Sequence, residues 1–347
     1  MICCQDKKNI VLCDCEQEEI FDIVDELQNV MKVSFEIGSC ICNEGAGRLL
    51  NIKRYITYIL YPLKYFLRRD NYKYVIGWQQ FFALFFSFYC RIFHLKKKNI
   101  VVALNFTYKK KKGIIGRVYK AYMEYCLDSK YMDYIHVPSE NYAKLCANEF
   151  NIPFSKFIVT TFGLPDTYSQ WKNSKVDYNN YSFSIGRSNR DFDFLIEAWK
   201  KMPSNELLVI ASDSYKTKSN LPQNIIHRRD ICGDRQFPYI ANCKMMIIPI
   251  DDGTICSGDT VLLKAMSYER AVVVTSPSTL AEMYVEDNVN GILVEKEIDN
   301  FVSIVSNLIN NPIKMEKLGI AARKYYKEFF SRRSMGRKIA ESINNKE

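Results

Sequence analysis

Short apolar runs of strand length alternate along this chain with longer runs that have the apolar spacing of a helix. Strand-like runs in the first half lie at 9–15, 32–37, 72–78, 99–106 and 131–139. The segment 16–30, between the first two, has apolar residues spaced by three and four and is predicted to be a helix. Because parallel strands need a long crossover, usually a helix, the alternation predicts an α/β fold with parallel sheets covered on both faces.

The chain is too long for one ordinary domain. Its 347 residues fit two domains of about 150–200 residues each, and the polar segment 166–180 is predicted to link them. After it, strand-like runs lie at 181–186, 206–212, 224–231, 244–250, 270–275 and 291–295, with helix-like runs at 192–202, 235–243 and 259–268. We expect a ligand in a cleft between the two domains, at the carboxyl ends of their strands.

Positive charge is concentrated in one segment. Residues 51–120 hold 16 Lys or Arg and one acidic residue, Asp70, whereas residues 1–50 hold 4 Lys or Arg and 10 Asp or Glu. This asymmetry predicts an anionic partner: anionic lipid headgroups, a polyprenyl-diphosphate lipid or a nucleic acid. The segment 51–70 mixes Tyr, Ile and Leu with Lys and Arg, which fits either a surface helix with extended basic side chains or a helix lying on a membrane surface.

The longest apolar run, 81–93, is about 13 residues long and is too short to span a membrane, so it is predicted to be a buried or interfacial helix. The N-terminal sequence lacks the apolar segment of a secretory signal. The twelve cysteines have no zinc-site spacing, and we expect free thiols in a reducing cytoplasm.

A loop between a strand and a helix carries two arginines. Gly186 is expected to allow a tight turn, and Arg187 and Arg190 follow it at the start of the helix 192–202. Guanidinium groups together with the amides of a helix N-terminus bind a diphosphate. The nearby Asp191 and Asp193 are interpreted as helix-capping residues and not as metal ligands.

A second loop introduces the helix 259–268 with small residues, namely Ser257, Gly258, Asp259 and Thr260. Small residues leave backbone amides free to donate to phosphate oxygens and to sugar hydroxyls. Lys264 lies one turn into this helix. As a three-donor cation it is expected to pair with Asp230 or to approach phosphate.

The order of these segments resembles the C-terminal nucleotide-sugar-binding domain of family 4 glycosyltransferases. The resemblance rests on the Gly-Arg loop in 183–202, the segment "RRDICGDRQFPYIANCKMMIIP", the small-residue loop, the strand "AVVVT" and the turn in "NGILV". It covers 130–340 and is strongest from 183 to 294. It implies a retaining enzyme of the GT-B fold, which has two facing Rossmann-like domains with parallel sheets and a cleft between them.

The resemblance also implies a division of the chain. Residues 1–168 would bind the acceptor, residues 169–330 would bind the nucleotide sugar, and the segment 331–347 would be a helix that packs back on the first domain.

The family's donor-binding residues carry over onto particular positions. Arg187 corresponds to the diphosphate-binding arginine of the family, and Arg190 replaces its partner lysine; both are expected to stabilise the leaving diphosphate. The remaining donor-side positions are Arg229, Asp230 and Ile231 near the base, the backbone amides of Thr260 and Val261 near the phosphates, and Glu282 near the sugar.

This sequence departs from the family at two glutamates, which hold the donor sugar and the ribose diol. Cys256 and Lys264 occupy their places. Lysine cannot accept hydrogen bonds from ribose hydroxyls, and Asp259 is the candidate to replace the missing carboxylate on the sugar.

Acceptor-side residues are predicted in the first domain. Family members often have a histidine after the strand at 99–106, and here that place holds Asn105 or Thr107, so no general base is evident. His136 is interpreted as a strand residue with a hydrogen-bonded ring. Lys109, Lys110, Lys111 and Lys112 are candidates to contact an anionic acceptor or lipid headgroups, and Gly163 is expected at the cleft.

We therefore expect a metal-independent retaining glycosyltransferase, without a cofactor, that uses a UDP- or GDP-linked sugar. Its acceptor would be a lipid-linked glycan at the cytoplasmic face of the cell membrane, as in capsule or O-antigen biosynthesis. The alternatives are a catalytically silent GT-B partner subunit, an enzyme similar to nucleotide-sugar epimerases, and a nucleic-acid-binding protein that uses the basic segment.

Overall fold

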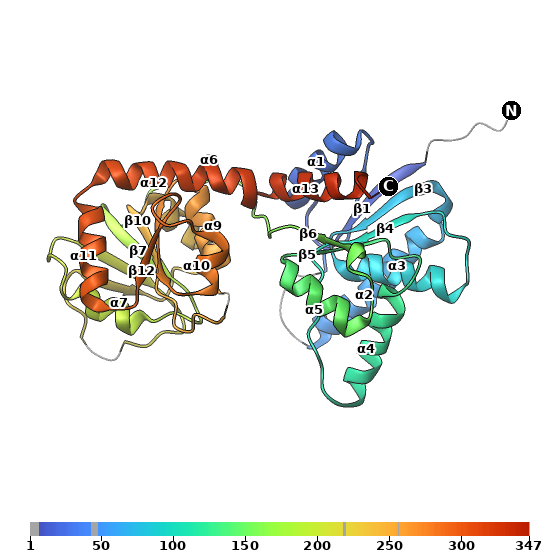
Figure 1. Ribbon diagram of the computed structural model, residues 1–347, viewed down its shortest axis with the longest axis horizontal. Helices are drawn as coiled ribbons and strands as arrows, with labels where there is room; N and C mark the ends of the chain where they lie inside the picture. Colours follow the sequence, from blue (N-terminus) through green and yellow to red (C-terminus); the bar gives the residue numbers. More distant parts are fainter. Residues whose placement is uncertain (1–6, 43–47, 218–219, 256, 347) are drawn as a thin grey trace. The chain divides into compact units, whose positions relative to one another are not determined.

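The structure is a computed structural model that describes residues 7–42, 48–217, 220–255 and 257–346. The chain folds as two compact units (Figure 1). Unit 1 comprises Met1–Pro165 and Arg332–Glu347, and unit 2 comprises Asp166–Ser331. The polar segment 166–180, predicted as a linker, therefore lies in unit 2, and it includes the short helix α6 (Tyr168–Trp171).

Unit 1 is built around a parallel sheet with the strand order β2-β1-β3-β4-β5-β6. Its strands are β1 (Lys8–Cys13), β2 (Glu36–Ser39), β3 (Tyr72–Gly77), β4 (Ile100–Ala103), β5 (Tyr134–Val137) and β6 (Phe157–Val159). The sequence predicted five of these strands and missed β6, which has only three residues. The predicted strand 32–37 also starts earlier than β2 does. The reason is that Lys32 adopts a left-handed conformation that ends the preceding helix.

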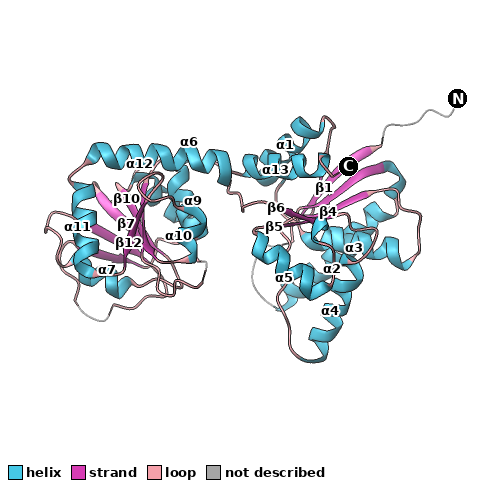
Figure 2. Ribbon diagram, in the orientation of Figure 1, coloured by secondary structure: helices cyan, strands magenta, loops and turns pink. Residues whose placement is uncertain are grey.

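Helices cover both faces of this sheet, as Figure 2 shows. The helices of unit 1 are α1 (Phe21–Met31), α2 (Arg48–Phe66), α3 (Gln80–Ile92), α4 (Gly113–Leu127), α5 (Glu140–Phe150) and α13 (Arg332–Asn344). Side chains of α1 and α13 share one core with the sheet, and those of α2 to α5 share the other. Helix α3 is buried, since Phe82, Leu84 and Phe86 are fully inaccessible to solvent.

Unit 2 is also built around a parallel sheet, with the strand order β12-β11-β10-β7-β8-β9. Its strands are β7 (Tyr181–Ile185), β8 (Leu207–Ala211), β9 (Ile225–Arg228), β10 (Met245–Ile248), β11 (Ala271–Ser276) and β12 (Ile292–Glu295). The chain runs outward from β7 to β9 and then crosses back to β10, next to β7. The loops after β7 and β10 leave in opposite directions, and ligands of such sheets bind where this reversal occurs.

The helices of unit 2 lie on both sides of this sheet (Figure 1). Besides α6, they are α7 (Phe192–Trp199), α8 (Gln236–Asn242), α9 (Asp259–Ser267), α10 (Thr279–Tyr284), α11 (Ile298–Ile309) and α12 (Pro312–Tyr325). Among the described residues, no helix of either unit is both long and apolar enough to cross a membrane.

Candidate donor site in unit 2

A cavity of about 600 Å³ lies at the carboxyl edge of the unit 2 sheet, where the strand order reverses. Loops after β7, β8, β9 and β10 all contribute to its wall. Its lining includes most of the predicted donor-side residues: Gly186, Arg187, Arg190, Ile231, Ser257, Gly258, Thr260 and Val261. Segments far apart in the sequence are thus brought together at the position that the topology favours for a ligand.

Arg190 is a half-buried cation in the wall of this cavity. Its Nη1 donates to the Asn189 carbonyl oxygen at 3.0 Å and to the Ser257 hydroxyl at 3.3 Å, whereas its buried Nε has no hydrogen-bond partner. Burial lowers the pKa of the Arg190 guanidinium to about 10, with Asp259 partly opposing the shift. The group therefore stays charged at neutral pH, and a charged guanidinium in the wall of a cavity is suited to an anionic ligand.

Two glycines make room for the Arg190 side chain. A Cβ atom at Gly186 would lie 2.7 Å from Arg190 Cγ, and one at Gly258 would lie 2.2 Å from Arg190 Nη2. Gly258 has a φ of +100°, which other residues rarely adopt, and it caps the N-terminus of α9. The sequence predicted Gly186 to allow a tight turn, but Gly186 is not among the residues with positive φ. The structural requirement for a glycine here is the close packing against Arg190.

Arg187 lies on the exposed side of the cavity and forms an ion pair with Asp213. Arg187 Nη2 is 2.7 Å from Asp213 Oδ2, and both side chains are partly exposed. Asp213 also lines the cavity, and sequence reasoning did not single it out. A signal was present, because Asp213 is the second residue after β8 and the carboxyl ends of parallel strands share one edge of the sheet.

Two of the three residues predicted near the nucleotide base do not line the cavity. Asp230 accepts from Arg228 Nε and Nη2, both at 2.7 Å, and this pairing holds the pKa of the Asp230 carboxyl at about 2. Arg229 Nη2 donates to the Asp213 carbonyl oxygen at 2.7 Å. Ile231 does line the cavity and is 2% exposed. Arg229 and Asp230 do not line the cavity.

The start of α9 contributes small residues to the cavity, as predicted, but one of its backbone amides already donates a hydrogen bond within the protein. The backbone N–H of Thr260 donates to Asp259 Oδ1 at 2.8 Å. Asp259 is half-buried and does not line the cavity, although it is near enough to Arg190 to influence its pKa. Asp213, rather than Asp259, therefore places a carboxylate in the described cavity wall.

Lys264 does not pair with Asp230. Its side chain is 5% exposed, its Nζ donates to Thr167 Oγ1 at 3.2 Å, and it lies over the rings of Phe237 and Tyr268. Asp230 pairs with Arg228 instead. Ring faces attract a desolvated ammonium group, which explains a buried lysine on α9. Cys256, the other departure from the family, lies outside the described residues.

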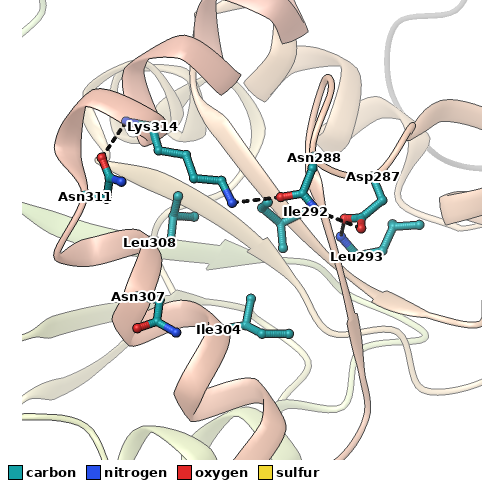
Figure 3. Close-up of a pocket in the computed structure, with 9 residues that line it drawn as sticks. All are labelled: Asp287, Asn288, Ile292, Leu293, Ile304, Asn307, Leu308, Asn311 and Lys314. Carbon is teal, nitrogen blue, oxygen red and sulfur yellow. Dashed lines mark hydrogen bonds between the residues drawn. The ribbon is translucent and has the colours of Figure 1, made fainter.

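A second cavity of unit 2, of about 330 Å³, is located between β12, α11 and the start of α12 (Figure 3). Its polar groups bond one another: Lys314 Nζ donates to Asn288 Oδ1 at 2.8 Å, and Asn288 Nδ2 donates to Asp287 Oδ2 at 2.9 Å. This cavity lies at the β12 edge and not at the reversal of strand order. Glu282, exposed in the first turn of α10, lines neither cavity.

The residues predicted on the acceptor side lie in unit 1. Asn105 follows β4 with a φ of +52°, and its N–H donates to His136 Nδ1 at 3.1 Å. His136 Nε2 is 2.8 Å from Thr160 Oγ1. The ring is therefore hydrogen-bonded on both sides inside a buried strand, as the sequence predicted, and burial lowers the pKa of His136 to about 4.

The four lysines at 109–112 form an exposed loop before α4. Lys110 Nζ lies 3.6 Å from Glu149 Oε2, and Lys111 Nζ lies 4.3 Å from the centre of the Tyr119 ring. Lys109 and Lys112 have no ion pair among the described residues. Gly163 is buried in the last part of unit 1 before Pro165.

Metal ligands are not clustered in the part of the chain that the structure describes: no group of three or more His, Cys, Asp or Glu side chains is arranged to hold a metal ion. Asp191 caps α7, its side chain accepting from the N–H of Phe194 at 2.9 Å, as the sequence predicted.

The two parallel six-stranded sheets with their helices define an α/β protein of the GT-B fold, which confirms the predicted fold class. Residues 181–311 match the family model of glycosyl transferases group 1. The match lies within unit 2 and confirms the resemblance predicted from the sequence. No curated protein matches the sequence.

Solved structures with the same fold have low sequence identity to this chain. HepE (Alr3699) from Anabaena, crystallised with UDP and glucose, is 14% identical, with a TM-score of 0.57 over 97% of this chain and 99% of that chain. A glycosyltransferase from Rickettsia africae is 12% identical, with a TM-score of 0.61 over 98% and 99%. WaaG, involved in lipopolysaccharide biosynthesis, is 14% identical, with a TM-score of 0.55 over 96% and 99%.

Proposed function

We propose that this protein is a retaining, metal-independent glycosyltransferase that needs no cofactor and uses a UDP- or GDP-linked sugar as donor. The observation that carries the proposal is the cavity at the strand-order reversal of unit 2, with the exposed Arg187 and the half-buried Arg190 among its lining residues. A nucleoside diphosphate is an anion that such a pair of guanidinium groups is suited to bind. HepE, with the same fold, was crystallised with UDP and with UDP-glucose.

In the proposed reaction the two arginines stabilise the charge that develops on the leaving diphosphate. Arg190 stays charged because its pKa of about 10 is well above neutral pH. An oxygen of the departing phosphate would take the proton of the acceptor hydroxyl, so that the protein need not supply a base. This fits the buried His136, whose ring nitrogens are both bonded within unit 1.

The proposed acceptor is a lipid-linked glycan at the cytoplasmic face of the cell membrane, as in capsule or O-antigen biosynthesis. The charge of residues 51–120, with 16 Lys or Arg and one Asp, supports an anionic surface as partner. WaaG is described as involved in lipopolysaccharide biosynthesis, and WaaB as a lipopolysaccharide outer core galactosyltransferase.

Donor turnover tests this function. The protein is incubated with a panel of UDP- and GDP-sugars, with and without candidate glycan acceptors, and the released nucleotide is measured. We expect release from one donor and a loss of about 100-fold or more in kcat/KM in the Arg187→Ala variant. Nucleotide binding without release from any donor would favour a catalytically silent partner subunit.

A further inference from the structure

Two helices of unit 1 expose aliphatic side chains that nothing in the described structure covers. In α2, Ile52, Ile56 and Leu60 are 55%, 50% and 57% exposed. Their spacing of four residues places them on one stripe of the helix. In α4, Ile114, Ile115 and Val118 are 70%, 73% and 66% exposed. We call these six residues the α2–α4 surface.

The two helices border the same buried helix, α3. Both pack on α3, since Tyr58 of α2 stacks with Phe81, and Tyr122 of α4 contacts Phe85. Both helices therefore border α3, and each exposes its own aliphatic residues.

Basic side chains flank the α2–α4 surface and are not neutralised. Five basic residues form no ion pair within the part of the chain that the structure describes: Lys53 and Lys64 of α2, Lys109 and Lys112 of the loop before α4, and Arg117 of α4. The segment 51–120 that contains them has one acidic residue. The surface therefore combines exposed aliphatic groups with an uncompensated positive charge.

Resting on the proposed function, we propose that the α2–α4 surface docks on an anionic lipid bilayer, with its aliphatic side chains among the lipid chains and the basic residues against the headgroups. Helix α4 extends away from the body of unit 1, as Figure 1 shows, which leaves its exposed first turn accessible. The contact would hold unit 1 at the membrane where a lipid-linked acceptor is found.

Charge and side-chain chemistry favour a bilayer over two other occupants. A second copy of the chain would bring two such basic segments together, and their charges repel. A nucleic acid would be bound by basic and stacking aromatic side chains, whereas Ile52, Ile56 and Ile115 offer neither. Aliphatic groups next to unpaired lysines are the combination that an anionic lipid surface binds.

Vesicle flotation tests the docking. The full-length protein is mixed with vesicles of phosphatidylcholine and phosphatidylglycerol, or of phosphatidylcholine alone, and the floated fraction is measured. We expect flotation with the anionic vesicles only, and a loss of about tenfold or more in partitioning for the double variant Ile56→Glu, Ile115→Glu. The matched control is Ile313→Glu in α12, a residue 65% exposed in unit 2, which should float like the parent protein.

Three results would overturn the proposal: equal flotation of the double variant and the parent protein, equal flotation with neutral vesicles, or a parent dimer that the double variant converts to a monomer. Thermal unfolding of each variant verifies that it folds. Because flotation requires no nucleotide sugar, it stays informative if the protein fails to turn over any donor. Conversely, the double variant should release nucleotide at the parent rate, since neither isoleucine lies in the donor cavity.

Discussion

At the scale of single residues, Asp213 is the group that would compete with a bound UDP or GDP for Arg187. Its carboxylate lies 2.7 Å from Arg187 Nη2 and repels a diphosphate in the same cavity. We predict that Asp213→Asn binds UDP or GDP about threefold to tenfold more tightly, with a smaller gain at high salt, because this charge is partly exposed. Calorimetric titration measures the change. Weaker binding would instead mean that Asp213 accepts a hydrogen bond from the ligand.

Gly258 controls the position of the other arginine. In Gly258→Ala, the new Cβ would overlap Arg190 Nη2, and the φ of +100° would cost about 1 kcal/mol of stability. We predict a clear loss of nucleotide affinity with only a small fall in the unfolding free energy. Gly113 of unit 1 has a φ of +70°, has open space around its Cβ position and does not line the donor cavity, so Gly113→Ala is the matched control for strain alone. Equal affinity losses in the two variants would contradict this role.

His136 makes unit 1 sensitive to acid. Its pKa is about 4 in the folded chain and near 6.5 in the unfolded chain, so below about pH 6.5 the unfolded state binds a proton that the folded state does not. Stability is therefore lost as pH falls from about 6.5 to about 4, by about 3 kcal/mol in total, and is unaffected above that window. Urea unfolding of the parent protein and of His136→Gln should show a weaker pH dependence in the variant. Parallel curves would refute the assignment.

At the scale of elements, α13 depends on close contact with α1. A Cβ at Gly336 would lie 3.1 Å from the Ile23 Cα, and Met335 and Ile339 on either side are fully buried. Gly336→Val should push the helices apart and lower the unfolding free energy of unit 1 by about 1–3 kcal/mol. The unfolding of unit 2, followed in the same scan, serves as the internal control. An unchanged unit 1 would show that α13 contributes little to its stability.

The elements themselves were largely predictable because buried parallel strands leave continuous apolar runs. The run 244–250 became β10, and the run 181–186 became β7. The three-residue strand β6 was missed because it is too short to show a periodicity.

Side-chain pairing was less predictable than the elements. The positions of Arg187 and Arg190 at the cavity followed from their loop, whereas the pairing of Asp230 with Arg228 depends on rotamers that residue spacing does not specify. The same holds for Lys264, whose partners Thr167 and Phe237 come from elements distant in sequence. Asp213 was missed because a single aspartate after a strand has no motif around it.

At the scale of the whole molecule, the two units have separate cores, and the ligand is assigned to one of them. A ligand that binds only the folded state of unit 2 should stabilise that unit alone. At a nucleotide concentration of about 100 times Kd, this gain is about 2.7 kcal/mol. In differential scanning calorimetry, UDP or GDP should therefore raise the unfolding temperature of unit 2 and leave that of unit 1 unchanged. A rise of the unit 1 transition alone would contradict the assignment.

The most direct measurement of the central claim is calorimetric titration of UDP and GDP into the parent protein and into two variants. Arg190→Met removes the half-buried cation of the cavity at the strand-order reversal, and Lys314→Met removes the lysine of the other cavity. We predict saturable binding of one nucleotide, a loss of about tenfold or more in Arg190→Met, and no change in Lys314→Met. Unchanged binding in Arg190→Met, or a loss in Lys314→Met, would show that the nucleotide site is elsewhere.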